Sequence, residues 1–484
     1  MEFGVHMGRL IVCSNRVAVP GISNDSPGGL ATGISGALKE NGGIWFGWSG
    51  EVFETGCRNT QEVTAEDVRY LTVDISKEEH ELYYLGFANH FLWPLCHFEL
   101  SYIRYSTLEY DSYRSVNRMM AERLVPFSRT DDLIWVHDYH LIPMAHELRA
   151  LGVQSNIGFF LHVPFPSFGM LRSLPVAQEL MACFMRYNVV GFQTEEDLES
   201  FRDSALRLLN VTIHSNDYLE YEGRLIRIGV FPIGVDNNVI QSSLANSEAC
   251  EDEVNIPVSG SLLPSENRGL ILGVDRIDYS KGLVEKLNAY ELFLKQYPEY
   301  HKVLSLMQIA TISRGSDPDY INLRERLENT VAHINGTYAD VDWVPIHYLN
   351  RSQSPTKLMV LMNLARICMV TSLRDGMNLV SKEYVSAQNP DDPGVLILSE
   401  LAGSAKQLEG ALLVNPYDVE SMARNIRVAV TMSRSERIER HASMYSSVKR
   451  YDLQNWRSSF IEALQATGSM ENVKKVRAPH AIVG

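Results

Sequence analysis

The sequence predicts an α/β protein with two doubly wound domains, each a parallel sheet covered by helices on both faces. Short runs of β-branched and aromatic residues recur along the chain, and each is followed by a longer amphipathic stretch. The runs are almost continuously apolar, which is typical of strands buried on both faces of a parallel sheet. The chain has 484 residues, more than one hydrophobic core usually organises. Two series of such strands therefore indicate two domains, with ligands bound at the carboxyl ends of the strands.

The first series of strands occupies the first half of the chain. We predict strands at Leu10–Ser14, Ile44–Trp48, Arg69–Ile75, Leu133–Val136, Ile157–Val163 and Val189–Gln193. The segments between them have the spacing of apolar residues expected of helices. These helix-like segments include Gly29–Glu40, Lys77–His90 and Tyr110–Leu124.

The second series repeats this alternation after a polar, acidic connection at residues 236–268. Its predicted strands are Leu270–Val274, Val303–Ile309, Val344–Tyr348, Ile367–Thr371, Val395–Leu398 and Leu412–Val414. We place the first domain at residues 8–240 and the second at 241–450. Residues 451–466 predict a last amphipathic helix, and the pattern is lost in a loosely ordered tail at 467–484.

Composition and charge restrict the partners. Apolar residues make up 45% of the chain and charged residues 21%, as in ordinary globular proteins. The formal net charge of −15 argues against a nucleic-acid partner and against an anionic membrane surface. A small anionic substrate stays open, because a few arginines can set the local field. No apolar stretch approaches the ~18 residues of a membrane span, so none is predicted.

The cysteines and the amino terminus point to a reducing compartment. The six cysteines include no CxxC pair, so neither a metal site nor a disulfide scaffold is expected, and reduced, buried thiols are predicted. Residues 1–8 contain no long apolar run and no small-residue cleavage site, so we expect no secretory signal. Residues 1–6 precede a second methionine, Met7, and read as a leader or an alternative start. The expected location is the cytoplasm.

Two strand-to-helix turns have the composition of phosphate-binding sites. Gly28 and Gly29 lie after the first strand, where glycines before a helix let backbone amides approach a phosphate. The alternative is an ordinary tight turn, since the string is not a dinucleotide fingerprint. In the second half, Arg276 and Lys281 follow an apolar strand and together suit a pyrophosphate leaving group, in place of a divalent metal. Their alternative is a surface salt-bridge cluster with Asp275 and Asp278.

A third group opens a helix after the strand Ile367–Thr371. It contains Asp375, and Gly376 and Asn378 stand close to the start of the helix, where free amides favour an anionic ligand. Glu383 lies a little over one turn into the helix, where a carboxylate can accept both hydroxyls of a ribose. A capped helix with a solvated glutamate is the alternative.

Polar residues also close two consecutive strands of the first half. His137, Asp138 and His140 follow one strand and His162 closes the next, so all four are expected on one rim of the sheet. A histidine in such a place is more often a hydrogen-bonded core residue. No fixed-spacing set of ligands accompanies these histidines, so we predict neither a metal nor another cofactor.

These motifs, in this order, resemble those of the trehalose-6-phosphate synthase family of retaining glycosyltransferases, from Arg9 to about Trp456. The shared strings are long: SNRVAVP, GGLATG, WFGWSG, FLWPLCHF, WVHDYHLIPMAHELR, FFLHVPFPS, GFQTEED, DRIDYSKGL, SRGSDPDY, RDGMNLVSKEYVSAQ and LLVNPYD. The resemblance implies a GT-B fold, two Rossmann-like domains facing a cleft, with the last helix crossing back to the first domain. It implies UDP-glucose and glucose 6-phosphate as substrates. It also suggests that the protein forms a homo-oligomer.

The resemblance also implies a role for individual residues. The predicted donor site comprises Gly28, Gly29, His162, Arg276, Lys281, Asp375, Leu379, Val380, Ser381, Lys382 and Glu383. Among these, His162, Arg276, Lys281 and Asp375 are the predicted catalytic residues. The predicted acceptor site comprises Arg16 and Arg314 on the 6-phosphate, with Trp48, Tyr84, Trp93 and Asp138 around the sugar. Two guanidinium groups suit a phosphate dianion, which they can bind bidentately.

Other functions remain open at this stage. A related transferase with another acceptor, such as glycerol 3-phosphate or an aminocyclitol phosphate, would differ in the acceptor residues, which here favour glucose 6-phosphate. A nucleotide-sugar sensor without turnover would lack either Asp375 or the two cations Arg276 and Lys281, and all three residues are present. At residues 351–353 the chain has Arg-Ser-Gln where an aromatic residue is common in relatives. The preferred nucleotide (UDP, GDP or ADP) is not fixed by the sequence.

Overall fold

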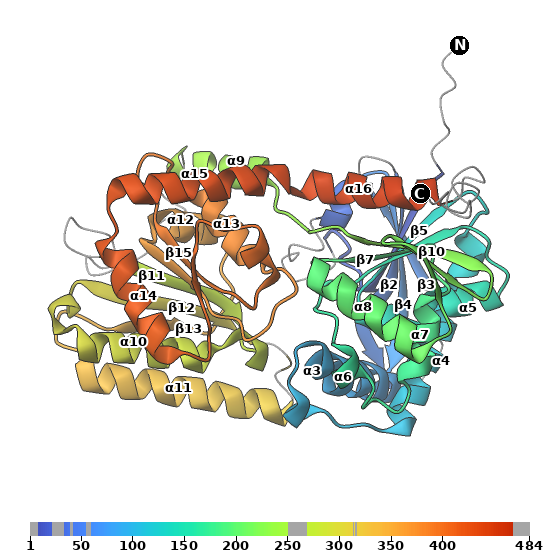
Figure 1. Ribbon diagram of the computed structural model, residues 1–484, viewed down its shortest axis with the longest axis horizontal. Helices are drawn as coiled ribbons and strands as arrows, with labels where there is room; N and C mark the ends of the chain where they lie inside the picture. The colour runs from blue at the N-terminus through green and yellow to red at the C-terminus, as the bar shows by residue number, and fades with distance from the viewer. Residues whose placement is uncertain are drawn as a thin grey trace, which may run out of the picture. The chain divides into compact units, whose positions relative to one another are not determined.

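The computed structural model describes residues 8–21, 33–38, 42–54, 60–249, 269–312, 314 and 317–467, without the side chains of 247–249. By its internal contacts the chain divides into two compact units (Figure 1). The first consists of Met1–Pro232 together with Trp456–Gly484, and the second of Ile233–Asn455. The change of unit at residues 232/233 comes eight residues before the predicted domain boundary at 240/241. The glycine pair Gly28 and Gly29 lies outside the described residues.

The first unit is built on a ten-stranded sheet with the order β3-β4-β2-β1-β5-β6-β7-β10-β9-β8. Its central pairs, from β4 to β10, are parallel, whereas β3–β4, β10–β9 and β8–β9 are antiparallel. The strands are β1 Leu10–Arg16, β2 Gly43–Phe53, β3 Thr60–Ala65, β4 Val68–Ser76, β5 Leu133–His137, β6 Asn156–Phe160, β7 Val189–Phe192, β8 Thr212–Ser215, β9 Tyr218–Tyr221 and β10 Arg224–Val230.

The helices of the first unit cover this sheet and its edges. They are α2 Lys77–Glu79, the π-helix η1 His80–Leu92, α3 Trp93–Cys96, α4 Thr107–Leu124, α5 Met144–Ala150, α6 Phe168–Leu171, α7 Ala177–Phe184 and α8 Glu195–Leu208. Residues 33–38 are also helical. The predicted helix Lys77–His90 is therefore a continuous helical segment that runs on to Cys96, with a long π-helical stretch inside it. Such stretches occur frequently at functional sites.

The last helix, α16 Leu453–Ala466, begins in the second unit and packs its later residues on the sheet of the first. Trp456 lies 4.9 Å from Trp135 of β5, measured between ring centroids. Phe460 stacks on the same indole at 4.7 Å. A Cβ at Gly158 of β6 would stand only 2.7 Å from the Phe460 ring, so a residue without a side chain lets this helix approach the sheet closely.

The second unit contains a fully parallel six-stranded sheet with the order β13-β12-β11-β14-β15-β16. Its strands are β11 Gly269–Arg276, β12 Leu304–Thr311, β13 Ile346–Leu349, β14 Ile367–Val370, β15 Val395–Ser399 and β16 Leu412–Val414. In Figure 1 one face carries α10 Leu283–Gln296, α11 Pro318–Tyr338 and α14 Val419–Thr431. The other carries α9 Asn237–Ala249, α12 Pro355–Leu364, α13 Leu379–Ala387 and α15 Arg434–Arg450.

The predicted α/β class with two parallel-rich sheets is confirmed. All twelve predicted strands are present, and eleven of them have ends within three residues of the prediction. The largest difference is at β2, which ends at Phe53 rather than Trp48. The next largest is at β6, which ends at Phe160 rather than Val163, so His162 lies in the loop beyond that strand. The antiparallel strands β3, β8 and β9, and β10 beside them, were not predicted. Within the described part of the chain, no helix has both the length and the apolar character needed to cross a membrane.

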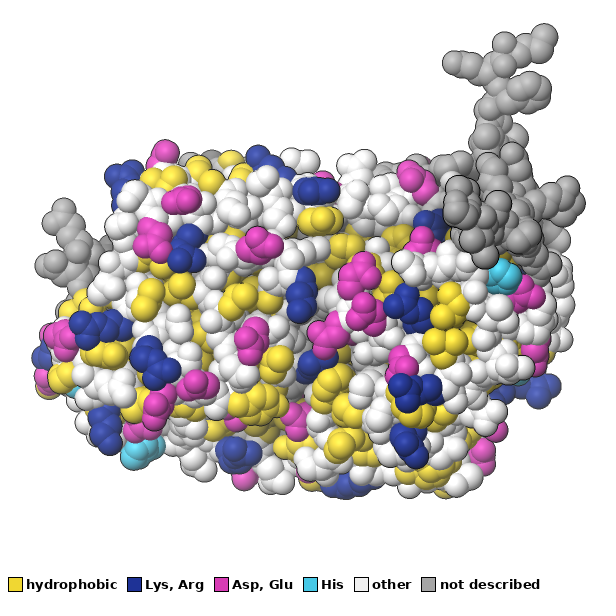
Figure 2. Space-filling view, viewed as in Figure 1, with side chains coloured by type: hydrophobic (Ala, Val, Ile, Leu, Met, Phe, Trp, Pro, Cys, Tyr) yellow, Lys and Arg dark blue, Asp and Glu magenta, His cyan; other side chains and the backbone are white. Residues whose placement is uncertain are grey.

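Surface charge is mixed on the face drawn in Figure 2. Lysine and arginine side chains there are interspersed with aspartate and glutamate, without a continuous basic stripe. A phosphate backbone needs such a stripe. The absence of a nucleic-acid partner stays a prediction from the net charge.

Candidate functional site

The first group of predicted site residues lies where β5 and β6 end. Asp138 directly follows β5 and has a positive φ of 73°, which is unusual for a residue with a side chain. Its backbone N–H donates to the carbonyl of Phe160 at 2.9 Å. Its carboxylate Oδ1 accepts the backbone N–H of His162 at 3.3 Å. The strained backbone of Asp138 is thus held by the neighbouring strand, and the predicted residues Asp138 and His162 are in direct contact.

His162 forms a second contact with His137, the last residue of β5. The Nδ1 atom of His137 lies 3.0 Å from Nε2 of His162. Burial lowers the pKa of His162 to about 3. Burial, and then the neighbouring imidazole, lower the pKa of His137 well below its usual value. Both rings are therefore neutral near pH 7, and each can offer one donor and one acceptor nitrogen.

The aromatic residues predicted for the acceptor site, Trp48, Tyr84 and Trp93, are connected through the rings of His140 and Tyr139. Trp48 of β2 and Tyr84 of η1 have centroids 5.3 Å apart, and Tyr84 stacks on His140 at 5.8 Å. His140 lies 3.9 Å from Tyr139, whose ring is 5.8 Å from Trp93. Because Trp48 and Trp93 are almost fully buried while Tyr84 is partly exposed, the phenol is the member of the set that solvent can reach.

Arg16, at the end of β1, lies against the backbone of Gly50. A Cβ built on Gly50 would stand 2.7 Å from Nε of Arg16 and 2.9 Å from its Nη2. Gly50 itself has φ of +93°, which favours glycine. Any residue with a side chain at position 50 would therefore clash with the guanidinium of Arg16 where it now lies. Arg16 is exposed, as a group that binds a soluble phosphate must be.

In the second unit, Lys281 and Asp375 form an ion pair of 2.6 Å between Nζ and Oδ2. Ser372 Oγ and Asn378 Nδ2 each donate to the same carboxylate oxygen at 3.1 Å. The side chains of Lys281 and Asp375 are 13% and 14% exposed. The loop after β11 and the loop after β14 are therefore tied together by two predicted catalytic residues.

Helix α13 begins beside this ion pair. Asn378, which has a positive φ of 75°, caps the helix by accepting the backbone N–H of Ser381 at 3.0 Å. The predicted donor residues Leu379, Val380, Ser381, Lys382 and Glu383 form its first turns. Burial raises the pKa of Glu383 to about 7, so its carboxyl ionises close to neutral pH.

Lys382 has a place that the sequence did not indicate. Its side chain is fully buried, and Nζ donates to the backbone carbonyl of Ile233 at 2.6 Å. Burial lowers its pKa to about 7. The Lys382 side chain is thus committed to the interior of the second unit, and only its backbone is suited to the predicted donor contact.

The acidic residues around the basic pair have other partners than Arg276 and Lys281. Asp275 pairs with the buried Lys286 at 2.7 Å. Asp278 accepts the hydroxyl of Tyr320 at 3.0 Å. Arg276 is exposed at the end of β11.

Arg314 is held inside the second unit. Its guanidinium donates to the hydroxyl of Tyr320 and lies 3.8 Å from Asp278 Oδ2, and its side chain is only 8% exposed. Its backbone has a positive φ of 50°. Arg314 was predicted to contact a phosphate, and in this structure its charge is balanced by Asp278.

Taken by unit, the predicted residues form two sets. The first unit carries Arg16, Trp48, Tyr84, Trp93, Asp138 and His162, and the second carries Arg276, Arg314, Lys281, Asp375 and the start of α13. Sequence reasoning missed His80, whose ring lies 5.6 Å from Trp48 and 5.4 Å from Tyr84. Its spacing of four residues from Tyr84 along a predicted helix was a usable signal.

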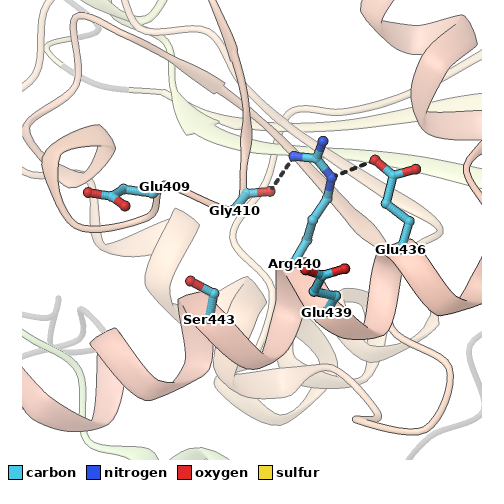
Figure 3. Close-up of a pocket in the computed structure, with 6 residues that line it drawn as sticks. All are labelled: Glu409, Gly410, Glu436, Glu439, Arg440 and Ser443. Atoms are coloured by element: carbon cyan, nitrogen blue, oxygen red, sulfur yellow. Dashed lines mark hydrogen bonds and ion pairs between the residues drawn. The ribbon is translucent and has the colours of Figure 1, made fainter.

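Two further observations bear on the chemistry. No three His, Cys, Asp or Glu side chains of the described residues are grouped so as to hold a metal ion, and the absence of a cofactor stays a prediction. A hollow of about 480 Å³ in the second unit is lined by Glu409, Gly410, Glu436, Glu439, Arg440 and Ser443 (Figure 3). In this hollow Arg440 donates hydrogen bonds to Glu436 and to the carbonyl of Gly410. None of the predicted site residues lines it.

The chain resembles known proteins both in sequence and in structure. The profile of Glycosyltransferase family 20 matches residues 17–466. The trehalose-6-phosphate synthase of Enterobacter sp. (strain 638) is 41% identical over 469 residues, which cover 95% of this chain and 96% of that protein. The trehalose-6-phosphate synthase of Escherichia coli O9:H4 (strain HS) is 42% identical over 463 residues, 95% of each protein.

Solved structures give the same result. An α,α-trehalose-phosphate synthase (UDP-forming) from Burkholderia xenovorans, in complex with glucose-6-phosphate, superimposes with a TM-score of 0.89 at 41% identity. The match covers 95% of this chain and 100% of that one. A protein from E. coli bound with UDP-2-fluoro glucose has a TM-score of 0.87 at 40% identity, over 95% and 99% of the two chains.

Proposed function

The chain belongs to glycosyltransferase family 20, with the GT-B fold of its structural relatives, and from this premise we propose the reaction that it catalyses. The protein transfers glucose from UDP-glucose to glucose 6-phosphate and releases α,α-trehalose 6-phosphate and UDP. The observation that carries the proposal is the Lys281–Asp375 pair at the start of α13, which joins a cation for a diphosphate to a carboxylate for a sugar. The ligands of the relatives, glucose-6-phosphate and UDP-2-fluoro glucose, support the choice of substrates.

The donor is assigned to residues that present cations and free amides. Arg276 and Lys281 hold the diphosphate, whose negative charge grows as its bond to the sugar breaks. The amides of Gly28 and Gly29 complete the phosphate contacts. The first turns of α13 lie beside the uridine, and Glu383 accepts the ribose hydroxyls. Asp375 and His162 orient the glucose moiety.

The acceptor is assigned to the aromatic set and two arginines. Arg16 and Arg314 bind the 6-phosphate, and Tyr84 contributes a phenol hydroxyl. For Arg314 this requires that the phosphate compete with Asp278 for the guanidinium, which lies 3.8 Å from that carboxylate. Trp48 and Trp93 shape the sugar site, and Asp138 accepts hydroxyl protons of glucose.

The proposed mechanism is a front-face transfer with retention. The bond from C1 of glucose to the β-phosphate oxygen breaks, and a bond from C1 to O1 of glucose 6-phosphate forms on the same face. The departing phosphate oxygen takes the proton of the acceptor hydroxyl, so no separate protein base is required. Arg276 and Lys281 stabilise the leaving group electrostatically. We include metal independence in the proposal because these two cations serve the role that a divalent metal has in other transferases.

The location and assembly belong to the same proposal. Cys13, Cys96, Cys183 and Cys368 are buried free thiols, which supports a reducing compartment such as the cytoplasm. No nucleic acid or membrane partner is proposed. A homo-oligomer is proposed on the family resemblance alone, and light scattering of the purified protein measures the oligomeric state directly.

The testing experiment incubates the purified protein with UDP-glucose and glucose 6-phosphate in the presence of EDTA. UDP release is measured and the sugar product is identified by mass and by resistance to reducing-sugar reagents after phosphatase treatment. We expect trehalose 6-phosphate at a rate that EDTA leaves unchanged. Absence of UDP above the control without acceptor would overturn the proposal, and GDP-glucose, ADP-glucose and glycerol 3-phosphate would then be compared.

A further inference from the structure

A cluster of three aromatic rings lies behind His162 in the first unit. It consists of Trp135, His137 and Trp456, whose centroids are 4.6 Å (Trp135–His137), 4.9 Å (Trp135–Trp456) and 6.1 Å (His137–Trp456) apart. Among the residues that the structure describes, Nε1 of both indoles and Nε2 of His137 are buried without a hydrogen-bond partner. Leaving buried polar nitrogens unpaired is costly, so the hydrogen on His137 should be placed where these three nitrogens satisfy one another best.

Two arrangements of hydrogens are compatible with the short contact between His137 and His162. If His162 donates from Nε2, His137 carries its hydrogen on Nε2, and the cluster then holds three donors and no acceptor. If His137 donates from Nδ1, its Nε2 is an acceptor beside two indoles that can only donate. In the second arrangement one buried water can accept from both indoles and donate to Nε2 of His137, whereas in the first it can accept from only two of the three donors.

We propose that His137 is a positioning residue that donates from Nδ1 to Nε2 of His162 and thereby fixes the hydrogen of His162 on Nδ1. This inference rests on the proposed function, in which His162 orients the glucose moiety of the donor. His162 as a residue is half-buried, and within the described residues its Nδ1 makes no hydrogen bond. With its hydrogen on Nδ1, His162 offers the sugar a hydrogen-bond donor directed by His137, while Asp138 holds its backbone.

The kinetic test uses two substitutions of His137. His137→Leu removes the hydrogen bond, and we expect kcat/KM for UDP-glucose to fall about tenfold, as for the loss of one hydrogen bond that orients the sugar. KM for glucose 6-phosphate should stay within about twofold. His137→Asn places an amide nitrogen near the position of Nδ1 and should recover most of the loss. An unchanged kcat/KM for UDP-glucose in His137→Leu would overturn the proposal.

A double-mutant cycle separates positioning from a general structural role. In a His162→Ala background, His137→Leu should have no further effect on kcat/KM for UDP-glucose, because it acts only through the missing imidazole. An equal loss in both backgrounds would overturn the proposal. Phe159→Leu serves as a matched control, because it truncates a buried ring of β6 that packs on Phe184 and Tyr187 rather than on His162. It should lower the Tm and leave the kinetics near wild type.

The tautomer is measured directly from the ring nitrogen shifts of protein labelled with ¹⁵N-histidine, with His137→Asn and His162→Asn used for assignment. We expect both rings to carry hydrogen on Nδ1, and hydrogen on Nε2 in both would overturn the assignment. This measurement needs no substrate. If the wild-type protein released no UDP, the proposed function would fail while the ring nitrogen shifts still decided the hydrogen bond.

Discussion

The ammonium of Lys281 and the carboxylate of Asp375 are 2.6 Å apart although 94 residues separate them in the chain. Asp375 also accepts hydrogen bonds from Ser372 and Asn378, so the carboxylate is fixed before any ligand binds. A preorganised pair of this kind stabilises charge that develops in a reaction without the cost of rearranging it. Its position at the start of α13 makes it the centre of the proposed donor site.

Asp375→Asn should show how much the Lys281–Asp375 pair contributes to catalysis and how much it contributes to stability. We expect kcat/KM for UDP-glucose to fall about 100-fold or more, because Lys281 loses its orientation and the sugar loses a carboxylate. The free energy of unfolding should fall by about 1–3 kcal/mol, since one partner of a largely buried pair is neutralised. The matched control is Asp342→Asn, which removes an exposed pair with Lys302 and should cost less than about 1 kcal/mol. A comparable loss of glucose 6-phosphate affinity in Asp375→Asn would contradict the assignment.

Arg276→Ala tests the leaving-group role. Turnover should fall by about 10²–10³, as for the loss of one group that stabilises developing charge. Binding of glucose 6-phosphate, measured by calorimetry, should survive. The control is Arg424→Ala, which alters an exposed pair with Glu420 on α14 and should leave both quantities unchanged. A parallel loss of turnover and acceptor binding would show that Arg276 does not act on the diphosphate.

Gly50→Ala tests whether acceptor binding depends on the placement of the Arg16 guanidinium against Gly50. The new Cβ would meet the guanidinium at 2.7 Å, and the φ of +93° adds backbone strain. We expect KM for glucose 6-phosphate to rise about tenfold while the affinity for UDP stays the same, because a displaced guanidinium loses bidentate contact with phosphate. Gly152→Ala is the matched control: its φ of +88° carries a similar strain, but no atom lies within 4 Å of the new Cβ. Equal KM values for glucose 6-phosphate in the two variants would contradict the proposal that Arg16 binds the acceptor phosphate.

The fold was predictable where local pattern and tertiary role agree. Buried parallel strands such as β5 and β11 are continuous apolar runs, and the polar residues that follow them mark the loops that carry the candidate site residues. The strand β3 escaped prediction because all its residues are partly covered or exposed at the sheet edge, so its sequence looks like a polar loop. The π-helical stretch η1 escaped as well, because packing rather than composition decides its hydrogen-bond pattern.

The sequence offered a set of candidate site residues, but it did not indicate the partners that these residues have in the structure. Asp278 was considered as a partner of the basic pair next to it, whereas the structure places it against Tyr320 and Arg314, more than thirty residues away. Lys382 was predicted among the donor residues, and its side chain is buried against Ile233. Such choices depend on which loops the sheet brings together, and a local motif does not contain that information.

Glu383 gives the proposed donor site a pH dependence. Burial raises the pKa of its carboxyl to about 7, and only the carboxylate can accept both ribose hydroxyls. As pH rises from 6 to 8 the ionised fraction of the free protein increases about tenfold, so the Kd for UDP should fall by a similar factor. Glu383→Gln should bind UDP more weakly and lack this component, which separates it from the titration of UDP itself. Glu409→Gln, an exposed glutamate of the same unit, should follow the wild type. A Kd for UDP with the same pH profile in the wild type and in Glu383→Gln would exclude the role of Glu383.

The neutral pair His137 and His162 should make the protein sensitive to mild acid. The folded pKa of His162 is about 3, against about 6.5 in the unfolded chain, so between these values unfolding takes up a proton. The free energy of unfolding therefore falls as pH falls below about 6.5, by at most about 2 kcal/mol per imidazole at pH 5. The double variant His137→Asn/His162→Asn lacks both groups, and its urea midpoint should change less between pH 7 and pH 5 than that of the wild type. His333→Asn, which removes an exposed imidazole beside Glu291, should keep the wild-type slope. Parallel profiles for the wild type and the double variant would mean that these imidazoles are protonated in the folded protein as readily as in the unfolded chain.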